Sequence, residues 1–278
     1  MIVRASVDDV RAIVRRRGMD ETSQRLALHC AEAGTAWAAR DESEVVGIAL
    51  ALDHDDERYL GDVFVEPSFR GQGLGRALLS AAFEEAGDRA RTMLVEPSDL
   101  ASLALAARYG LRLREPVLQL AGAIAHEEEL AKMAAGDYRF EVAAIDAEAH
   151  GFGLRALDRQ TRAIARDEDH AAFAREASGC AFFLRGEFVA YAYIWPDGRV
   201  GPLACASPAY LVQILAFALR MLTEEGASWC AALVPGSNLR VTRAALKSGL
   251  RITGALALAS DSSDGDLSTY VGCHALQL

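Results

Sequence analysis

Cysteine is sparse in this sequence, and its scatter removes two classes of protein at the outset. No Cys-x-x-Cys or Cys/His spacing typical of a metal site occurs around the five cysteines, which are Cys30, Cys180, Cys205, Cys230 and Cys273. Their odd number, together with an N-terminus that lacks a signal peptide, favours a reducing compartment over a disulfide framework. We therefore expect a cytoplasmic protein that binds no metal.

Basic charge is also in short supply. The formal net charge is −10, and most of the acidic excess lies in residues 1–130. Because a nucleic-acid binder needs a cationic face, we expect no nucleic-acid partner. Residues 201–219 carry no charge, but two prolines and a glutamine interrupt them. This favours a buried helix from about Ala209 over a membrane span, so we expect no membrane partner either.

A repeated order of elements is what the sequence does contain. Its 278 residues suit two domains of about 100–150 residues each. In each half, the apolar pattern predicts strand, helix, hairpin, strand, helix, strand and helix, and then a glycine and a last strand. Gly110 and Gly249 are the two closing glycines. We predict an internal duplication, with domains over residues 1–125 and 137–278 and a charged, alanine-rich linker over 126–136.

The sharpest local signal is a glycine-rich loop between an apolar strand and an apolar helix. Its three glycines allow a tight turn and close approach of a ligand, and an arginine stands at each end of the loop. Amides at the start of a helix are unpaired and lie at the positive end of its dipole. These features predict a pyrophosphate site, a ligand-free turn being the alternative. The loop is neither a dinucleotide fingerprint nor a Walker A loop, because no Gly-Lys-Ser/Thr occurs.

The segment VFVEPSFRGQGLG (residues 63–75) resembles motif A of the GNAT superfamily of N-acetyltransferases, and the order of elements over residues 2–121 agrees. The resemblance implies an α/β (α+β) fold of two tandem GNAT-like domains, each a mixed, largely antiparallel sheet flanked by helices. It also implies a homodimer and acetyl-CoA as co-substrate. The residues implied to bind acetyl-CoA are Val63, Phe64, Val65, Arg70, Gly71, Gln72, Gly73, Leu74, Gly75 and Arg76.

Two carboxylates are candidates for the base that such a reaction needs. In this family an amine attacks the thioester directly, with a base for its proton and an N–H for the oxyanion. Asp62 and Glu66 alternate with Phe64 onto one face of the predicted strand. Either residue could act as base or amine anchor, and a solvated surface carboxylate is the alternative. The acidic residues 53–57 could line a mouth for a cationic substrate, although a solvated turn is favoured.

The general acid is the weak point of the resemblance. Counting back from Gly110 places Ala106 in the slot of the usual motif-B tyrosine, and Ser102 in the alanine slot. The usual acid is therefore missing. Ser102, Tyr109 or water are the candidates to protonate the leaving thiolate.

The second half lacks the glycine loop. Its strand-to-helix junction reads VGPLACASPA (residues 200–209), without an arginine, and Pro208 removes an amide that a phosphate needs. We interpret this half as a degenerate GNAT-like domain. Arg159, Arg162 and Arg166 share a predicted helix face and could bind an anion or dock the first domain, but a salt-bridged helix surface is favoured.

These observations predict an acetyl-CoA-dependent N-acetyltransferase. It would acetylate a primary amine of a small acceptor by direct attack in a ternary complex. The alternative is an acetyl-CoA-binding GNAT-like sensor or interaction module without turnover, and the missing tyrosine supports it. A third interpretation places the acceptor site in the cleft of the second domain.

Overall fold

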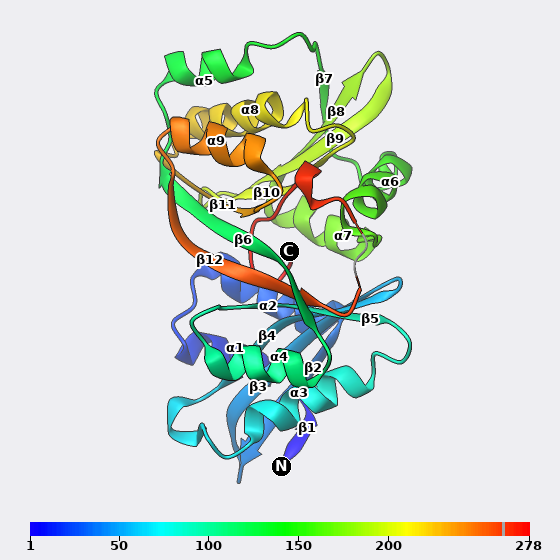
Figure 1. Ribbon diagram of the computed structural model, residues 1–278, viewed down its shortest axis with the longest axis vertical. Coiled ribbons are helices and arrows are strands. Elements are labelled where there is room, and N and C mark those ends of the chain that lie inside the picture. Colours follow the sequence, from blue (N-terminus) through cyan, green and yellow to red (C-terminus); the bar gives the residue numbers. More distant parts are fainter. Residues whose placement is uncertain (263–264) are drawn as a thin grey trace. The chain divides into compact units, whose positions relative to one another are not determined.

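The computed structural model describes residues 1–262 and 265–278, which form two compact units (Figure 1). The described residues of unit 1 are 1–114, 257–262 and 275–277. Those of unit 2 are 115–256, 265–274 and 278. Each unit therefore contains chain from both halves of the sequence.

Unit 1 is a mixed, largely antiparallel sheet with helices, as expected. Its strands follow the hydrogen-bonded order β1-β2-β3-β4-β5-β12, and only β4 and β5 are parallel. The strands are β1 (Ile2–Arg4), β2 (Thr35–Asp41), β3 (Glu44–His54), β4 (Glu57–Val65), β5 (Ala90–Val95) and β12 (Arg251–Ser260). The helices are α1 (Val7–Arg16), α2 (Glu21–Ala33), α3 (Leu74–Glu84) and α4 (Leu100–Arg108).

Unit 2 has two runs of hydrogen-bonded strands, β13-β10-β9-β8-β7 and β12-β6-β11. Its strands other than β12 are β6 (Arg112–Ala123), β7 (Glu141–Ala144), β8 (Ser178–Leu184), β9 (Glu187–Ile194), β10 (Val200–Cys205), β11 (Trp229–Pro235) and β13 (Tyr270–Val271). Its helices are α5 (Glu127–Ala134), α6 (Gly151–Arg162), α7 (Asp167–Glu176), α8 (Leu211–Glu224) and α9 (Leu239–Lys247).

The element order confirms the predicted duplication. The series β1, α1, α2, β2, β3, β4, α3, β5, α4, β6 is matched by β7, α6, α7, β8, β9, β10, α8, β11, α9, β12. The structure adds helices that the pattern did not predict. Residues 147–166, expected to be mainly helical, contain α6, which ends at Ala163 in the left-handed conformation (φ 60°), and α7 follows from Asp167. The expected linker contains α5, whose Leu130 and Met133 are buried in the apolar core of unit 2.

The last strand of each half of the sequence pairs with a strand from the other half. Strand β6 is antiparallel to β11, with 117–123 opposite 229–235. Strand β12 is antiparallel to β5, with 257–260 opposite 92–95. This reciprocal exchange is why the units divide at Arg114 and not at the expected residue 125.

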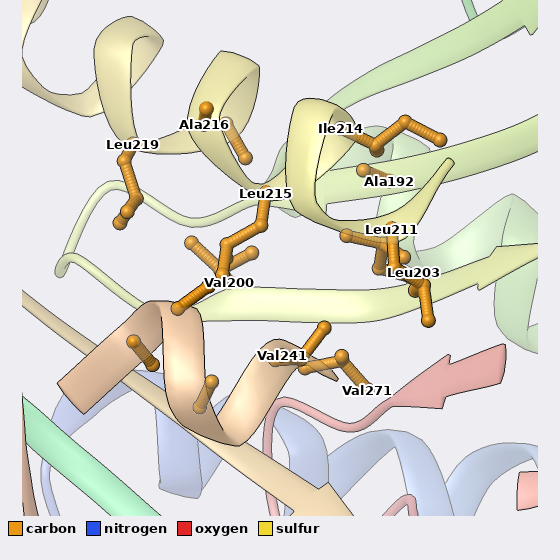
Figure 2. Packing of buried hydrophobic residues seen from close by; sticks show 14 of the residues in the cluster. Ala192, Val200, Leu203, Leu211, Ile214, Leu215, Ala216, Leu219, Val241 and Val271 are labelled. Carbon is orange, nitrogen blue, oxygen red and sulfur yellow. The ribbon is translucent and has the colours of Figure 1, made fainter. Parts of the chain in front are cut away.

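The uncharged run of the second half forms α8 and buries it. Leu211 and Leu215 of α8 pack against Leu203 and Val200 of β10 (Figure 2), and all four are at most 3% exposed. Burying each such side chain contributes about 1.5–3 kcal/mol. No helix in residues 1–262 and 265–278 is both long enough and apolar enough to cross a membrane.

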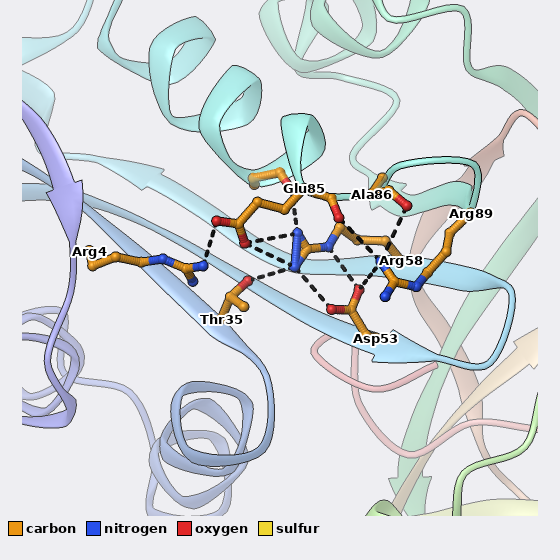
Figure 3. Close-up of polar contacts among 8 residues, drawn as sticks. Arg4, Thr35, Asp53, Arg58, Glu85, Ala86 and Arg89 are labelled. Carbon is orange, nitrogen blue, oxygen red and sulfur yellow. Dashed lines mark hydrogen bonds and ion pairs between the residues drawn. The ribbon is translucent and has the colours of Figure 1, made fainter.

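A buried arginine fixes the first half of β4 (Figure 3). Arg58 is 1% exposed and donates to both carboxylate oxygens of Asp53, at 2.9 and 3.1 Å. It also donates to Thr35 Oγ1 at 3.1 Å and to the Ala82 carbonyl at 2.8 Å. Burial lowers the pKa of Arg58, and the carboxylates of Asp53 and Glu85 oppose that shift. Asp53 is therefore a structural partner of β4 and does not belong to a mouth for a cationic substrate.

Candidate functional site

Strand β4 separates from β5 halfway along its length. The two strands pair from Glu57 to Leu60, whereas β3 accompanies β4 to Val65. The register of β3 and β4 shifts at Gly61, the extra residue of a β-bulge. A bulge bends its strand, which accounts for the separation. In the described structure, β4 beyond Leu60 has no strand partner on the side away from β3.

The glycine loop after β4 is shaped by two glycines in the left-handed region. Gly71 and Gly73 have φ of 79° and 80°, which side chains with a Cβ rarely adopt. A Cβ at Gly71 would point into open space, with nothing within 4 Å. Gly73 is the N-cap of α3 and no side chain caps the helix, so its first amides are left for a ligand. Arg70 Nε holds the loop against the Val65 carbonyl at 3.0 Å.

The predicted cofactor residues gather around two adjoining clefts. A cleft of about 460 Å³ is lined by Val63, Phe64, Val65, Phe69, Arg70, Gly71, Gly73, Leu74, Gly75, Arg76, Asp99, Ala101, Ser102 and Leu105. A second cleft of about 490 Å³ shares part of this wall and adds Gln72, Ala104 and Arg108. All ten residues expected to hold acetyl-CoA thus line one cleft or the other.

Helix α4 supplies the wall that sequence reasoning missed. Ala101, Ala104, Leu105 and Arg108 lie three or four positions apart and so share one helix face. That spacing was the available signal. With Arg70 and Arg76 opposite, the clefts carry more positive than negative charge. An uncapped helix start, open space over Gly71 and this charge fit a pyrophosphate group.

Ser102 is placed in the cleft but its hydroxyl has a partner. It donates to Asp99 Oδ2 at 2.6 Å, and this hydrogen bond lowers the pKa of Asp99. Asp99 is also the N-cap of α4. Ala106, in the tyrosine slot, is 2% exposed. Tyr109 packs edge-to-face on Phe83, with ring centres 5.7 Å apart, and its hydroxyl donates to the Arg76 carbonyl at 3.4 Å.

Asp62 and Glu66 lie outside both clefts and are held by the end of α1. Arg17 forms an ion pair with Asp62, and Arg16 Nε donates to Glu66 at 2.8 Å. The two acidic side chains are 16% and 22% exposed, so neither is a solvated surface carboxylate. Burial raises the pKa of Asp62, while the Arg17 charge opposes that shift.

The charged residues of the second half form a buried cluster, and the surface interpretation is wrong for most of them. Arg166 and Asp169 are each 1% exposed and pair at 3.0 Å. His170 Nε2 lies 2.8 Å from Asp158 Oδ2, and its Nδ1 lies 3.0 Å from Tyr193 Oη. Further members are Tyr191, Arg162 and Tyr270; only Arg159 of the predicted face is exposed. The carboxylates of Asp158 and Asp169 are each held by buried partners, which indicates a structural role for these two residues.

Comparisons with known proteins agree with this geometry. Residues 7–111 match the acetyltransferase (GNAT) family. Comparison with curated proteins gave no match.

Solved structures share the fold across the whole chain. A putative acetyltransferase from Pyrococcus horikoshii has a TM-score of 0.76 at 14% identity, over 99% of this chain and 94% of that one. A GCN5-related N-acetyltransferase from Sphaerobacter thermophilus has 0.64 at 15%, over 97% and 98%. A tandem GNAT protein from the clavulanic acid biosynthesis pathway has 0.63 at 16%, over 95% and 99%. At these identities the likeness establishes the fold alone.

Proposed function

We propose that this chain, whose residues 7–111 match the acetyltransferase (GNAT) family, transfers acetyl from acetyl-CoA to a primary amine of a small acceptor. The observation that carries the proposal is the uncapped, glycine-shaped start of α3, which opens into a cleft beside the unpaired second half of β4. The second unit has no such loop.

The chain's own residues divide the work as follows. The amides of residues 71–76, with Arg70 and Arg76, would bind the pyrophosphate, and the backbone of Val63 and Val65 would bind the pantetheine arm. Bound acetyl-CoA would supply an activated thioester. An N–H of β4 would stabilise the oxyanion, and Asp62 would hold the amine and accept its proton. Ser102 lines the cleft and is a source for the proton that the thiolate needs.

A second candidate is an acetyl-CoA sensor without turnover. The observation that favours it is Ala106, which leaves the tyrosine slot without an ionisable group. Both functions require the same cofactor site. They differ in whether an amine releases free CoA.

Calorimetric titration with acetyl-CoA, followed by a thiol-release screen of amines, tests the proposal. We expect one site per chain. Gly73→Glu places a carboxylate in the anion site and a Cβ at positive φ, and should weaken binding at least about 100-fold, or ~3 kcal/mol. The matched control is Ala206→Glu, an exposed position at the equivalent junction of unit 2.

Each outcome separates the candidates. Binding that Gly73→Glu abolishes and Ala206→Glu leaves intact, with amine-dependent thiol release, supports the enzyme. Binding without release for any amine supports the sensor. No binding contradicts both.

A further inference from the structure

Two consecutive arginines at the end of α1 meet the acidic residues of β4, and the first of them is fully engaged. Arg16 Nε donates to Glu66 at 2.8 Å, and Nη1 donates to Glu44 at 2.7 Å. Nη2 donates to the Val45 carbonyl at 2.5 Å. All three guanidinium nitrogens are used, which makes Arg16 a structural link between α1, β3 and β4.

Arg17 differs from its neighbour. In residues 1–262 and 265–278, its guanidinium has one hydrogen-bond partner, the Asp62 carboxylate. Its Cζ lies 4.3 Å from the centre of the Phe64 ring, an arrangement that favours the cation and fixes its plane. A guanidinium offers five N–H donors in a rigid fork, so most of the donors of Arg17 are available to a ligand.

The Arg17–Asp62 pair can be reached from solvent. Their side chains are 22% and 16% exposed, so the pair is neither fully buried nor freely solvated. A cation with unused donors in direct contact with a carboxylate matches a ligand that carries both charges close together. Its carboxylate can bind the fork of Arg17 and its ammonium can bind Asp62.

Phe64 connects this pair to the proposed cofactor site. Its ring contacts Arg17, and the same residue lines the cleft of about 460 Å³. A ligand bound between Arg17 and Asp62 is therefore one side chain away from that cleft.

We infer that the acceptor is an α-amino acid, in which the amine and the carboxylate are carried by one carbon. The inference rests on the proposed function and names its substrate class. Arg17 would bind the α-carboxylate and Asp62 the α-ammonium. Asp62 accepts one ammonium proton, the amine nitrogen bonds to the acetyl carbon, and the carbon–sulfur bond breaks. The second proton of the amine passes to the leaving thiolate, which gives the N-acetyl amino acid and free CoA.

The contact between Arg17 and Asp62 explains why simple amines should be poorer acceptors. An amine without a carboxylate must compete with Arg17 for Asp62. It brings no negative charge to pair with the guanidinium that it displaces. An α-amino acid gives each partner a new opposite charge. An ω-amino acid separates its charges by several carbons and cannot satisfy two groups that touch each other.

The test uses matched trios in the thiol-release assay on the full chain. Each trio consists of an amino acid, its α-amide and its decarboxylated amine, for phenylalanine, methionine, glutamine, lysine and serine. We expect at least one amino acid to exceed its amide and its amine roughly 10- to 100-fold in kcat/KM, the range for charged hydrogen bonds. Arg17→Met should remove this preference by lowering kcat/KM for the amino acid alone, and Arg17→Lys should retain part of it. Arg15→Met, an exposed change on the same turn, is the control.

The outcomes distinguish this inference from the proposed function. If the decarboxylated amines or the amides match the amino acids, or if Arg17→Met lowers kcat/KM equally for all three, the amino-acid inference is overturned and the acetyltransferase proposal stands. If diamines or peptides release thiol and no amino acid does, the same conclusion holds. If no compound releases thiol although acetyl-CoA binds, both fall.

Discussion

The two units share one order of elements, but they differ in what lies between two equivalent strands. In unit 1, β4 and β5 part after Leu60 and the clefts with glycine walls open at α3. In unit 2, the equivalent strands are β10 and β11, and β13 pairs with β10 while Gly272 forms a bridge to Leu233 of β11. The two residues of β13 thus occupy with protein core the space that is a cleft in unit 1.

The starts of the equivalent helices differ in the same sense. Helix α3 follows a glycine N-cap in the left-handed conformation, and α8 follows Tyr210 in the right-handed conformation with Pro208 just before it. Unit 1 leaves the amides at the start of α3 without a cap, whereas unit 2 contains a buried charged cluster around Asp158 and Arg166. Under the proposed function, one copy of the fold would serve binding and the other would serve stability.

The largest expected effect is the loss of a buried charge in unit 2. Asp158→Ala leaves His170 and the Tyr191 hydroxyl without their partner, and removing one member of a buried pair costs about 3–5 kcal/mol. Urea unfolding followed by tryptophan fluorescence measures this, and acetyl-CoA binding at unit 1 should survive below the transition. Asp8→Ala, an exposed change in unit 1, is the control. Equal stability of the two variants would contradict a structural role for the cluster.

A smaller effect compares the caps of the equivalent helices α4 and α9. Asn238 is 1% exposed, caps α9 and donates to the Tyr270 carbonyl at 3.0 Å, so Asn238→Ala also removes a hydrogen bond to β13. We expect a loss of about 2–3 kcal/mol, against about 1 kcal/mol for Asp99→Ala, an exposed cap. Denaturant midpoints at equal slope measure the difference. If Asp99→Ala is the more damaging variant, the view of unit 2 as the stabilised copy fails.

The smallest effect is a shift in pH dependence. Burial raises the pKa of Asp62 and Arg17 opposes it, so Arg17→Met should raise that pKa further. Activity that needs the Asp62 carboxylate is lost as the pH falls through this pKa. The acid limb of kcat/KM for a simple amine should therefore move to higher pH, by about one unit. An unchanged limb, with Arg15→Met as reference, would show that Asp62 is not the titrating group.

The local parts of the site could be predicted from the sequence. The positive φ of a glycine and the lack of a cap at a helix start both depend on a few neighbouring residues. The loop could therefore be recognised from residues 70–76. Helices α4 and α9 agree with the predicted order of elements, because each has a cap and an apolar face and is followed by the predicted closing glycine. The duplication followed from the same signals.

The long-range parts could not be predicted. The sequence of an apolar strand does not identify the strand with which it pairs. Nothing in β6 or β12 therefore indicated that each pairs with a strand from the other half of the sequence. The ion pairs Arg16–Glu66 and Arg17–Asp62 join residues that are 50 and 45 positions apart. Charged residues are seldom fully buried without partners, and partners distant in sequence are invisible to spacing. Arg166 was therefore assigned to a helix surface, although it is buried and donates to the Tyr270 hydroxyl, 104 positions away.

The strand exchange also has a consequence for how this protein is made. The last strand of the first unit's sheet is encoded roughly 140 residues after the rest of that unit. At synthesis rates of about 5–20 residues per second, the ribosome needs roughly 7–30 s more before that sheet can close. During this interval β5 has β4 on one side but not yet β12 on the other, and the second half of the chain is still being synthesised. The order of translation thus makes the sheet of unit 1 dependent on residues that are synthesised after most of unit 2.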